Sequence, residues 1–283
     1  TASLVNNKDV IIISSVSCIY GLGDPKEYSK LIVTLLIGKI IELKETFKKL
    51  VSIHYIRNDL VLEPGTFRVR GDVVEIHPPY EEFAYRIELF GDEIEKIESF
   101  HPVSGEVIKN LKELYIFPAK HFVTTQENMN RALIDIRSEL ITRLEDLREQ
   151  GLLVEAQRLE QRTFYDMEMM TELGYCSGIE NYSRHLEGRK PGTRPHTLLD
   201  FFPDDYLMFI DESHVSIPQI KAMYKGDLSR KNTLIEYGFR LPSAKDNRPM
   251  KFNEFENIIN QVIYVSATPS AYEDEKSEGN VIE

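Results

Sequence analysis

The stretch Leu207-Met-Phe-Ile-Asp-Glu-Ser-His214 decides how the rest of this chain is interpreted. An unbroken apolar run, predicted as a strand over residues 206–210, is followed at once by two acidic residues. Continuous apolar runs are typical of strands buried on both faces of a parallel sheet. Acidic residues directly after such a strand form the Walker B arrangement, in which Asp211 helps to hold Mg²⁺ and Glu212 orients and deprotonates the attacking water. His214 would report the nucleotide state to neighbouring motifs. The alternative is a strand that simply ends in a polar loop.

A second strand end of the same kind follows further along the chain. Gln261-Val-Ile-Tyr-Val265 is apolar, and Ser266-Ala-Thr-Pro269 comes directly after it. In helicases, a Ser-Ala-Thr stretch hydrogen-bonds the Asp-Glu-x-His region and couples it to the DNA-binding surface. A plain turn would explain this stretch alone, but two such strand ends in helicase order predict one site. Its candidate catalytic residues are Asp211, Glu212, His214, Ser266 and Thr268, and Asp211 and Glu212 are also its candidate nucleotide and Mg²⁺ contacts.

A third apolar run, Asp9-Val-Ile-Ile-Ile-Ser-Ser-Val-Ser17, is predicted to be another buried parallel strand. Residues 20–25 then form a turn, with Asp24 as a helix cap and Pro25 at the first helical position. Three such strands predict one open α/β sheet with polar residues at its carboxyl edge, where ligands collect.

The motif that would bind the phosphates of ATP is missing from the sequence. No Gly-x-x-x-x-Gly-Lys-Ser/Thr occurs in the 283 residues. Without it, no backbone nest cradles the phosphates and no lysine reaches them. We therefore predict that this chain alone neither binds ATP tightly nor hydrolyses it. Because it begins at Thr1 and ends abruptly at Glu283, we expect it to be a piece of a longer protein.

Composition limits the class of protein and its location. The apolar content of 42% is that of a globular protein, and the net charge of −12 argues mildly against nucleic-acid binding, although one basic cleft is enough for it. No long uncharged run or signal peptide is present, so we expect no membrane span. Cys18 and Cys176 lack metal-ligand spacing and are predicted to be buried and reduced, as in a cytoplasmic protein.

Two segments interrupt the predicted sheet. From Leu43 to Pro118, short alternating segments separated by turn signals predict an antiparallel meander with one solvated face. The predicted strands cover residues 51–56, 66–70, 72–76, 85–90 and 93–97. From about Thr125 to Leu173, apolar residues three or four apart predict a helical hairpin that Gly151 interrupts. We interpret both segments as insertions into a single parent domain.

Taken together, several stretches of the chain resemble the UvrB family of bacterial nucleotide excision repair. The similar stretches, beyond Asp211–His214 and Tyr264–Pro269, are residues 9–23, 65–76, 155–162, 178–186 and 238–244. The resemblance implies an incomplete RecA-like P-loop NTPase motor domain, of the α/β class, with an inserted antiparallel α+β domain and an inserted helical domain. The implied division is residues 1–30 and 196–283 for the motor domain, 31–118 for the UvrA-binding insertion and 119–195 for the helical insertion. The tail at residues 274–279 is expected to be an exposed linker.

The resemblance also implies the activity and the partners. Proteins of this family take damaged DNA from UvrA, verify the lesion using ATP and Mg²⁺, and recruit UvrC for incision. Four residues match family positions that contact UvrA, namely Arg57, Arg68, Arg70 and Glu88. Arginine suits such an interface because it makes bidentate, salt-sensitive contacts. The alternative is that these charges only solvate the outer face of the sheet.

DNA contacts are expected from strand-edge loops and from the helical segment. The candidates are Tyr20, Asn181, Tyr182, Arg184, His185, Phe239 and Arg240. Aromatic and arginine side chains suit single-stranded or locally melted DNA, because stacking gives roughly 1–3 kcal/mol per base without reading sequence. The alternative for Tyr182 or Phe239 alone is core packing. An alternative for the whole chain is a non-catalytic UvrA-binding adaptor, like the module in the transcription-repair coupling factor.

Overall fold

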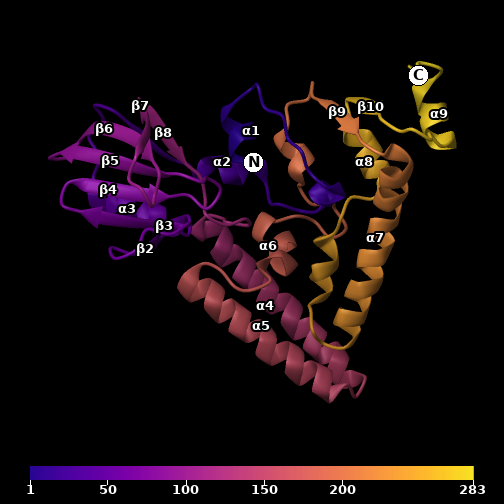
Figure 1. Cartoon of the computed structure of the whole chain (residues 1–283). Coiled ribbons are helices and arrows are strands. Elements are labelled where there is room, and N and C mark those ends of the chain that lie inside the picture. Colours follow the sequence, from indigo (N-terminus) through magenta and orange to yellow (C-terminus); the bar gives the residue numbers. More distant parts are fainter. Residues whose placement is uncertain (283) are drawn as a thin grey trace. The chain divides into compact units, whose positions relative to one another are not determined.

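The structure, a computed structural model, describes residues 1–282 (Figure 1). The chain divides into two compact units, one of residues 26–125 and one of residues 1–25 with 126–283. Together they make a mixed α/β protein with a helical segment. Among the described residues, no helix is both long and apolar enough to cross a membrane.

The unit of residues 26–125 is built on a six-stranded sheet in the order β2-β3-β4-β5-β6-β7. Its strands are β2 (Ile56–Arg57), β3 (Thr66–Arg70), β4 (Val73–His77), β5 (Ala84–Phe90), β6 (Glu93–Phe100) and β7 (Val107–Leu111). Every neighbouring pair from β3 to β7 is antiparallel, whereas β2 and β3 are parallel. The predicted meander is thus confirmed. Gly71 and Gly91, with φ of 61° and 62°, lie in the tight turns that join β3 to β4 and β5 to β6, where a positive φ favours glycine.

One face of this sheet carries the core of the unit. Side chains from β3 to β6 are buried there, among them Phe67, Ile76, Ile87 and Ile97. They pack with α3 (Leu43–Ser52) and with the antiparallel pair of β1 (Val33–Leu36) and β8 (Glu113–Ile116). The helix α2 (Pro25–Lys30) begins at Pro25, as predicted.

The strand predicted over residues 51–56 is wrong. Residues up to Ser52 belong to α3, and β2 begins only at Ile56. The spacing of Leu43, Phe47 and Leu50 places three apolar side chains on one side of a helix, and all three contact the core. This helical face outweighs the local alternation after Val51.

The opposite face of the sheet is less solvated than predicted. The register aligns Arg68, Glu75, Arg86 and Glu98 in one row across four strands. Glu75 and Glu98 are only 5% and 2% exposed. The long arginine side chains cover these carboxylates, so the face carries an internal ladder of ion pairs rather than loose surface charges.

The second unit contains the predicted helical hairpin. It consists of α4 (Gln126–Glu149) and α5 (Leu153–Leu173), with Gly151 at φ 75° between them. The predicted stripe is buried at Ile136, Leu140, Leu144 and Leu147, and half-buried at Leu133. The shorter helices of this unit are α1 (Ala2–Asn6), η1 (Val16–Ile19), η2 (Ile179–Tyr182), α6 (Ser183–Glu187), η3 (Leu198–Phe201), η4 (Pro242–Asp246), α8 (Phe252–Ile258) and α9 (Ala271–Ser277), where η marks a 3₁₀ helix.

The parallel part of this unit is smaller than predicted. β9 (Leu207–Ile210) and β10 (Gln261–Tyr264) pair in parallel, and α7 (Ser213–Glu236) follows β9. The predicted strand over residues 9–17 does not form. That segment is irregular before η1, and Ile11 and Ile13 are 92% and 97% exposed. A parallel strand of this kind needs hydrogen-bonded neighbours and cover on both faces, and the described residues give it neither.

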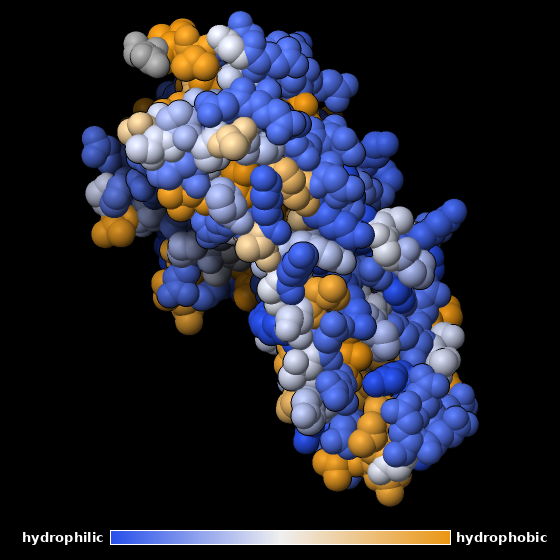
Figure 2. Space-filling view, turned by 90° about the vertical axis from the view of Figure 1, so that its right-hand side faces the viewer, coloured by the Kyte–Doolittle hydropathy of each residue, from blue (hydrophilic) through white to orange (hydrophobic). Residues whose placement is uncertain are grey.

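The C-terminal segment also differs from the prediction. The predicted exposure of residues 274–279 is confirmed for all but Ser277, but residues 274–277 continue the helix α9. The cause is a capping box in which Ser270 and Glu273 satisfy each other's backbone amides. Figure 2 shows a largely hydrophilic face on which apolar side chains gather in small groups, one of them at the C-terminal end of the chain.

Candidate functional site

The two predicted strand ends meet at one edge of the parallel pair. Ile210 lies opposite Tyr264 in the register. Past the strands, the amide of Val265 donates to the carbonyl of Ile210 at 2.9 Å, and the amide of Ser213 donates to the carbonyl of Val265 at 3.0 Å. These bonds fix the Asp-Glu-Ser-His turn against the Ser-Ala-Thr turn.

A side-chain hydrogen bond joins the two turns. Ser266 Oγ and His214 Nδ1 are 2.8 Å apart, and Ser266 Oγ also accepts from the amide of Thr268 at 3.1 Å. His214 Nδ1 lies 3.5 Å from the carboxylate of Glu212. The bond predicted between the Ser-Ala-Thr stretch and the Asp-Glu-x-His region is therefore present.

The acidic pair is presented to solvent on a sharp turn. Asp211 and Glu212 are both exposed, and Glu212 has a φ of 45°, in the left-handed region that non-glycine residues seldom adopt. Asp211 Oδ1 accepts from the amide of Glu212 at 3.0 Å. Exposed carboxylates at this edge fit a Mg²⁺ that arrives with a nucleotide. Within residues 1–282, however, no group of three potential ligands forms a complete metal site.

Three of the predicted partner residues, Arg68, Arg70 and Glu88, belong to the ion-paired face of the six-stranded sheet, whereas Arg57 lies beside the core residue Phe67 in the register. Arg68 pairs with Glu75, and Arg86 bridges Glu75 at 2.9 Å and Glu98 at 2.8 Å. Lys96 continues the ladder to Glu98 at 2.5 Å and to Glu88 at 3.5 Å. For Glu98, burial raises the pKa, but hydrogen bonds from Lys96 and Arg86 outweigh it and hold the pKa below its usual value.

Arg57 and Arg70 lie at the β2–β3 side of this sheet and are more exposed than Arg68. Arg57 pairs with Asp59: its Nε lies 3.2 and 3.1 Å from the two carboxylate oxygens, and its Nη2 lies 2.9 Å from one of them. Arg70 Nη2 donates to the carbonyl of Asp59 at 3.4 Å. The four predicted partner residues therefore occur on one sheet, but with different freedom to bind.

Several predicted DNA contacts are instead engaged inside their own unit. Tyr182 is 5% exposed, and its hydroxyl donates to Asp166 at 2.8 Å. Burial raises the pKa of Tyr182, with a further contribution from the charge of Asp166. Asn181 Nδ2 donates to the carbonyl of Gly178 at 2.8 Å. Tyr182 thus has no open ring face for a base, as its core-packing alternative states.

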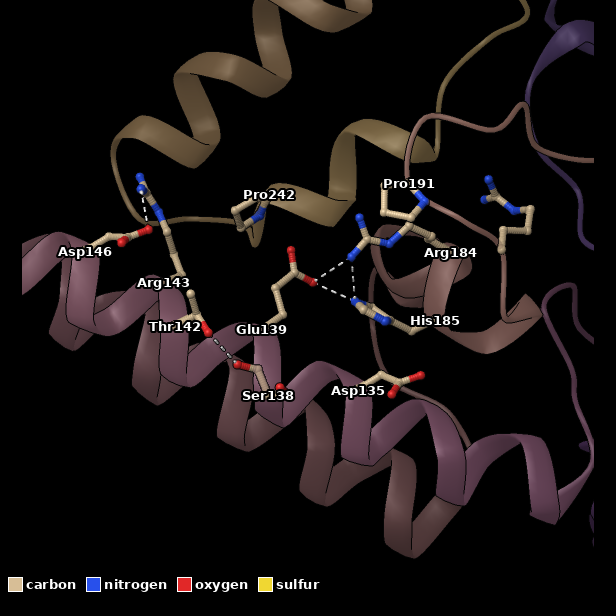
Figure 3. A pocket seen from close by; sticks show the side chains of 11 residues that line it. Asp135, Ser138, Glu139, Thr142, Arg143, Asp146, Arg184, His185, Pro191 and Pro242 are labelled. Atoms are coloured by element: carbon tan, nitrogen blue, oxygen red, sulfur yellow. Dashed lines mark hydrogen bonds and ion pairs between the residues drawn. The ribbon is translucent and has the colours of Figure 1, made fainter.

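Arg184 and His185 belong to a polar network around Glu139 (Figure 3). Glu139 lies 2.6 Å from His185 Nε2, 3.4 Å from Arg184 and 2.7 Å from the amide of Ser243. Burial would raise the pKa of Glu139, but the hydrogen bonds from His185 and Ser243 hold it below its usual value. The network lines a groove of about 490 Å³ between α4, α6 and the start of η4.

Sequence reasoning missed Glu139. It stands beside the buried stripe of α4 and resembles any helix-surface carboxylate, and its partners are 46 and 104 positions away. The only signal in the sequence was the adjacent pair Arg184-His185. Such a pair predicts a nearby acidic partner once the structure shows that His185 is buried.

The remaining predicted DNA contacts are more accessible. Phe239 is 43% exposed, and Arg158 lies over its ring at 4.4 Å. Arg240 follows it, half-buried, and donates to the carbonyl of Phe239 at 2.8 Å. Tyr20 is half-buried, and burial together with the charge of Asp227 raises its pKa.

Comparison with known proteins identifies the relatives of this chain. The family model of the UvrB interaction domain matches residues 33–122, and that of the UvrB third helical domain matches residues 127–188. The chain is 59% identical to a protein of Carboxydothermus hydrogenoformans over 96% of its length, 58% to one of Geobacillus kaustophilus over 99%, and 56% to one of Streptomyces coelicolor over 99%. Each relative is named UvrABC system protein B, and the chain spans 41%, 43% and 40% of their respective lengths. The chain therefore belongs to the UvrB family.

Proposed function

We propose that the protein to which this chain belongs is the damage-verifying subunit of bacterial nucleotide excision repair. In this proposal it is a superfamily 2 helicase-type ATPase of the cytoplasm that receives damaged, locally melted DNA from UvrA and recruits UvrC. The identity of 56% to 59% with UvrABC system protein B supports the family. The observation that carries the ATPase role is the Ser266–His214 hydrogen bond, which joins the two motif turns at one sheet edge.

The proposal includes a division of the chain into domains. We assign residues 1–30 and 196–283 to one RecA-like motor domain, 31–118 to a UvrA-binding insertion and 119–195 to a helical insertion. The parallel pairing of β9 and β10, with acidic and hydroxyl residues after their ends, is what a motor domain of this kind requires.

In the whole protein, Asp211 would hold nucleotide-bound Mg²⁺, and Glu212 would orient and deprotonate water. The Ser266–His214 bond and the adjacent Thr268 would link this site to the DNA-binding surface. The sequence contains no phosphate loop, so the chain alone is proposed to be inactive. In the whole protein, Glu212→Gln should lower ATP turnover by about 10²–10⁴-fold, as loss of a general base does. Asp274→Asn, which changes an exposed carboxylate on α9, is the matched control and should leave turnover unchanged. Equal turnover by both variants would refute the assignment.

For the chain itself, the proposed role is to bind UvrA through the ion-paired sheet. Arg70→Glu should weaken binding without unfolding, because Arg70 is exposed and donates only a long hydrogen bond of 3.4 Å to the carbonyl of Asp59. Arg68→Glu is a poorer test, because it would place a second carboxylate beside the buried Glu75. Lys109→Glu on β7 is the control for charge reversal. Binding of UvrA, followed at low and at physiological salt, should fall for Arg70→Glu only.

Contact with single-stranded DNA is proposed for the loops that carry Tyr20, Phe239 and Arg240. Asn181, Tyr182, Arg184 and His185 would support these loops or contact DNA after a rearrangement, because all four are hydrogen-bonded within the unit. Photocrosslinking from position 239 to a damaged strand tests the first group. The adaptor alternative predicts UvrA binding without any dependence on Glu212.

A further inference from the structure

The loop between β2 and β3 exposes apolar side chains that the fold does not use. Leu60 is 86% exposed and Val61 is 51% exposed, and Ile56, at the start of β2, is 67% exposed. None of the three belongs to the core of the unit. Neighbouring exposed aliphatic side chains on one short segment are typical of a binding surface.

This loop is tied down at both ends. At its start, Asn58 Oδ1 accepts from the amides of Leu60 and Val61 at 3.1 and 3.2 Å. At its end, Thr66 Oγ1 accepts from the amide of Glu63 at 2.9 Å and donates to its carbonyl at 2.7 Å. The exposed side chains therefore stand on an ordered backbone, which lowers the entropy that a partner must remove on binding.

Asp59 connects the loop to the arginines beside it. Its carboxylate accepts from Arg57 and from the amide of Val69 at 3.0 Å, and its carbonyl accepts from Arg70. Hydrogen bonds from Arg57 and from the Val69 amide lower the pKa of Asp59, so it stays charged at neutral pH. Both guanidinium groups are thus hydrogen-bonded to Asp59, the residue directly before Leu60.

We infer that this loop is the apolar centre of the surface that binds UvrA, with Leu60 as its anchor and Arg57 and Arg70 on its rim. The inference rests on the proposed function, which assigns the two arginines to UvrA. It adds that the partner offers an apolar pocket bordered by acidic groups. A second copy of this chain is a poor occupant, because a two-fold contact centred on the loop would bring cationic rims together.

The two parts of the surface have separable effects on binding. An apolar anchor at the centre of an interface contributes mainly to the dissociation rate, and its contribution changes little with salt. Rim arginines act mainly on the association rate and on its salt dependence. Leu60 and Arg70 can therefore be distinguished by kinetics even where their effects on affinity are similar.

The test measures binding of the full chain to immobilised UvrA at two salt concentrations. Leu60→Ala should weaken binding about tenfold or more through faster dissociation, with the salt dependence kept. Ile108→Ala, which truncates an aliphatic side chain 58% exposed on β7, is the matched control and should stay within about twofold. Arg70→Ala should slow association and flatten the salt dependence. The thermal unfolding midpoint should be the same for Leu60→Ala and Ile108→Ala.

Each outcome decides the inference. If the Leu60→Ala variant binds UvrA as tightly as the Ile108→Ala variant while Arg70→Ala weakens UvrA binding, the loop is not the anchor and the proposed function stands. If neither Leu60→Ala nor Arg70→Ala weakens the binding of UvrA, the proposed UvrA surface is refuted as well. If sedimentation shows that the chain self-associates and that Leu60→Ala abolishes this, the loop binds a second copy and the inference is overturned.

Discussion

The six-stranded sheet and the parallel pair of β9 and β10 differ in how well their apolar side chains are buried. The antiparallel sheet of residues 26–125 buries Phe67, Ile76 and Ile97 to 1% exposure or less. In the parallel pair of β9 and β10, Leu207 and Phe209 remain 48% and 63% exposed. Hairpin-connected strands find their partners within a short length of chain, whereas parallel strands need crossovers and cover on both faces.

Because its parallel pair is largely exposed, the second unit needs other contacts to stabilise it. Beside its two-stranded sheet, that unit is held by helices that dock through polar groups and close backbone contacts. Arg158 Nη1 donates to the carbonyl of Tyr237 at 2.6 Å, and Glu139 bridges α4 to the amide of Ser243. The first unit is built on one sheet and its core. The second unit has a core around Ile210, Ile217 and Phe255 and adds polar contacts between distant helices.

The largest expected effect is on the free energy of unfolding, when one phenylalanine of the six-stranded sheet and one of the parallel pair are each replaced by alanine. Phe67→Ala should lower the free energy of unfolding of the first unit by about 3–5 kcal/mol, because it leaves a cavity in a closed core. Phe209→Ala should change stability by about 0.5 kcal/mol or less, because its ring is already in water. Denaturant unfolding with hydrogen exchange assigned to each unit measures both. Similar losses would show that β9 is covered in solution.

The next effect tests the docking of α5 in the second unit. Gly238 has a φ of 69°, and a Cβ there would lie 2.3 Å from the carbonyl oxygen of Glu155. Gly238→Ala should therefore destabilise this unit by about 1–3 kcal/mol or more. Gly226→Ala in α7 is the matched control: its Cβ would meet nothing within 4 Å, and the change should stabilise by roughly 0.5–1 kcal/mol. Thermal unfolding of the two variants compares them, and equal midpoints would mean that α5 moves freely.

The smallest effect is an opposite response of the two units to mild acid. In the first unit, burial, with the charge of Lys120 nearby, lowers the pKa of His54 from 6.5 to about 4. The unfolded chain then takes up the proton first, so this unit should lose stability as the pH falls from 6.5 towards 4. In the second unit, the hydrogen bond that His196 donates to the Glu187 carboxylate raises the pKa of His196. Its contribution is fully present below pH 6.5 and is lost as the pH rises through the raised value.

Single substitutions separate the two histidines. His54→Asn should remove the loss in the first unit, since asparagine tolerates the φ of 69° at this position. His196→Gln should remove the gain in the second unit. Unit-resolved hydrogen exchange at pH 7.5 and 5.5 measures both. An unchanged acid response in His54→Asn would assign the effect to other groups.

Local patterns determined much of the antiparallel unit. The alternation and the Gly-Asp turns predicted the bounds of β3 correctly. They predicted β4, β5 and the start of β6 to within a residue or two. The helical spacing located α4 and α5, and the two motif turns were found from the residues that follow each apolar run. These features depend on side chains a few positions apart, so the sequence alone contains them.

Tertiary structure decided the rest. The apolar run at residues 9–17 was predicted as a strand but stays irregular, because a buried strand requires neighbours that its own residues do not specify. The cover over Glu75 and the role of Glu139 could not be predicted, and the burial of Tyr182 was only one of two alternatives, since each depends on partners from other segments of the chain. Periodicity shows which faces are apolar, but the balance between desolvation and pairing is settled only when distant residues meet.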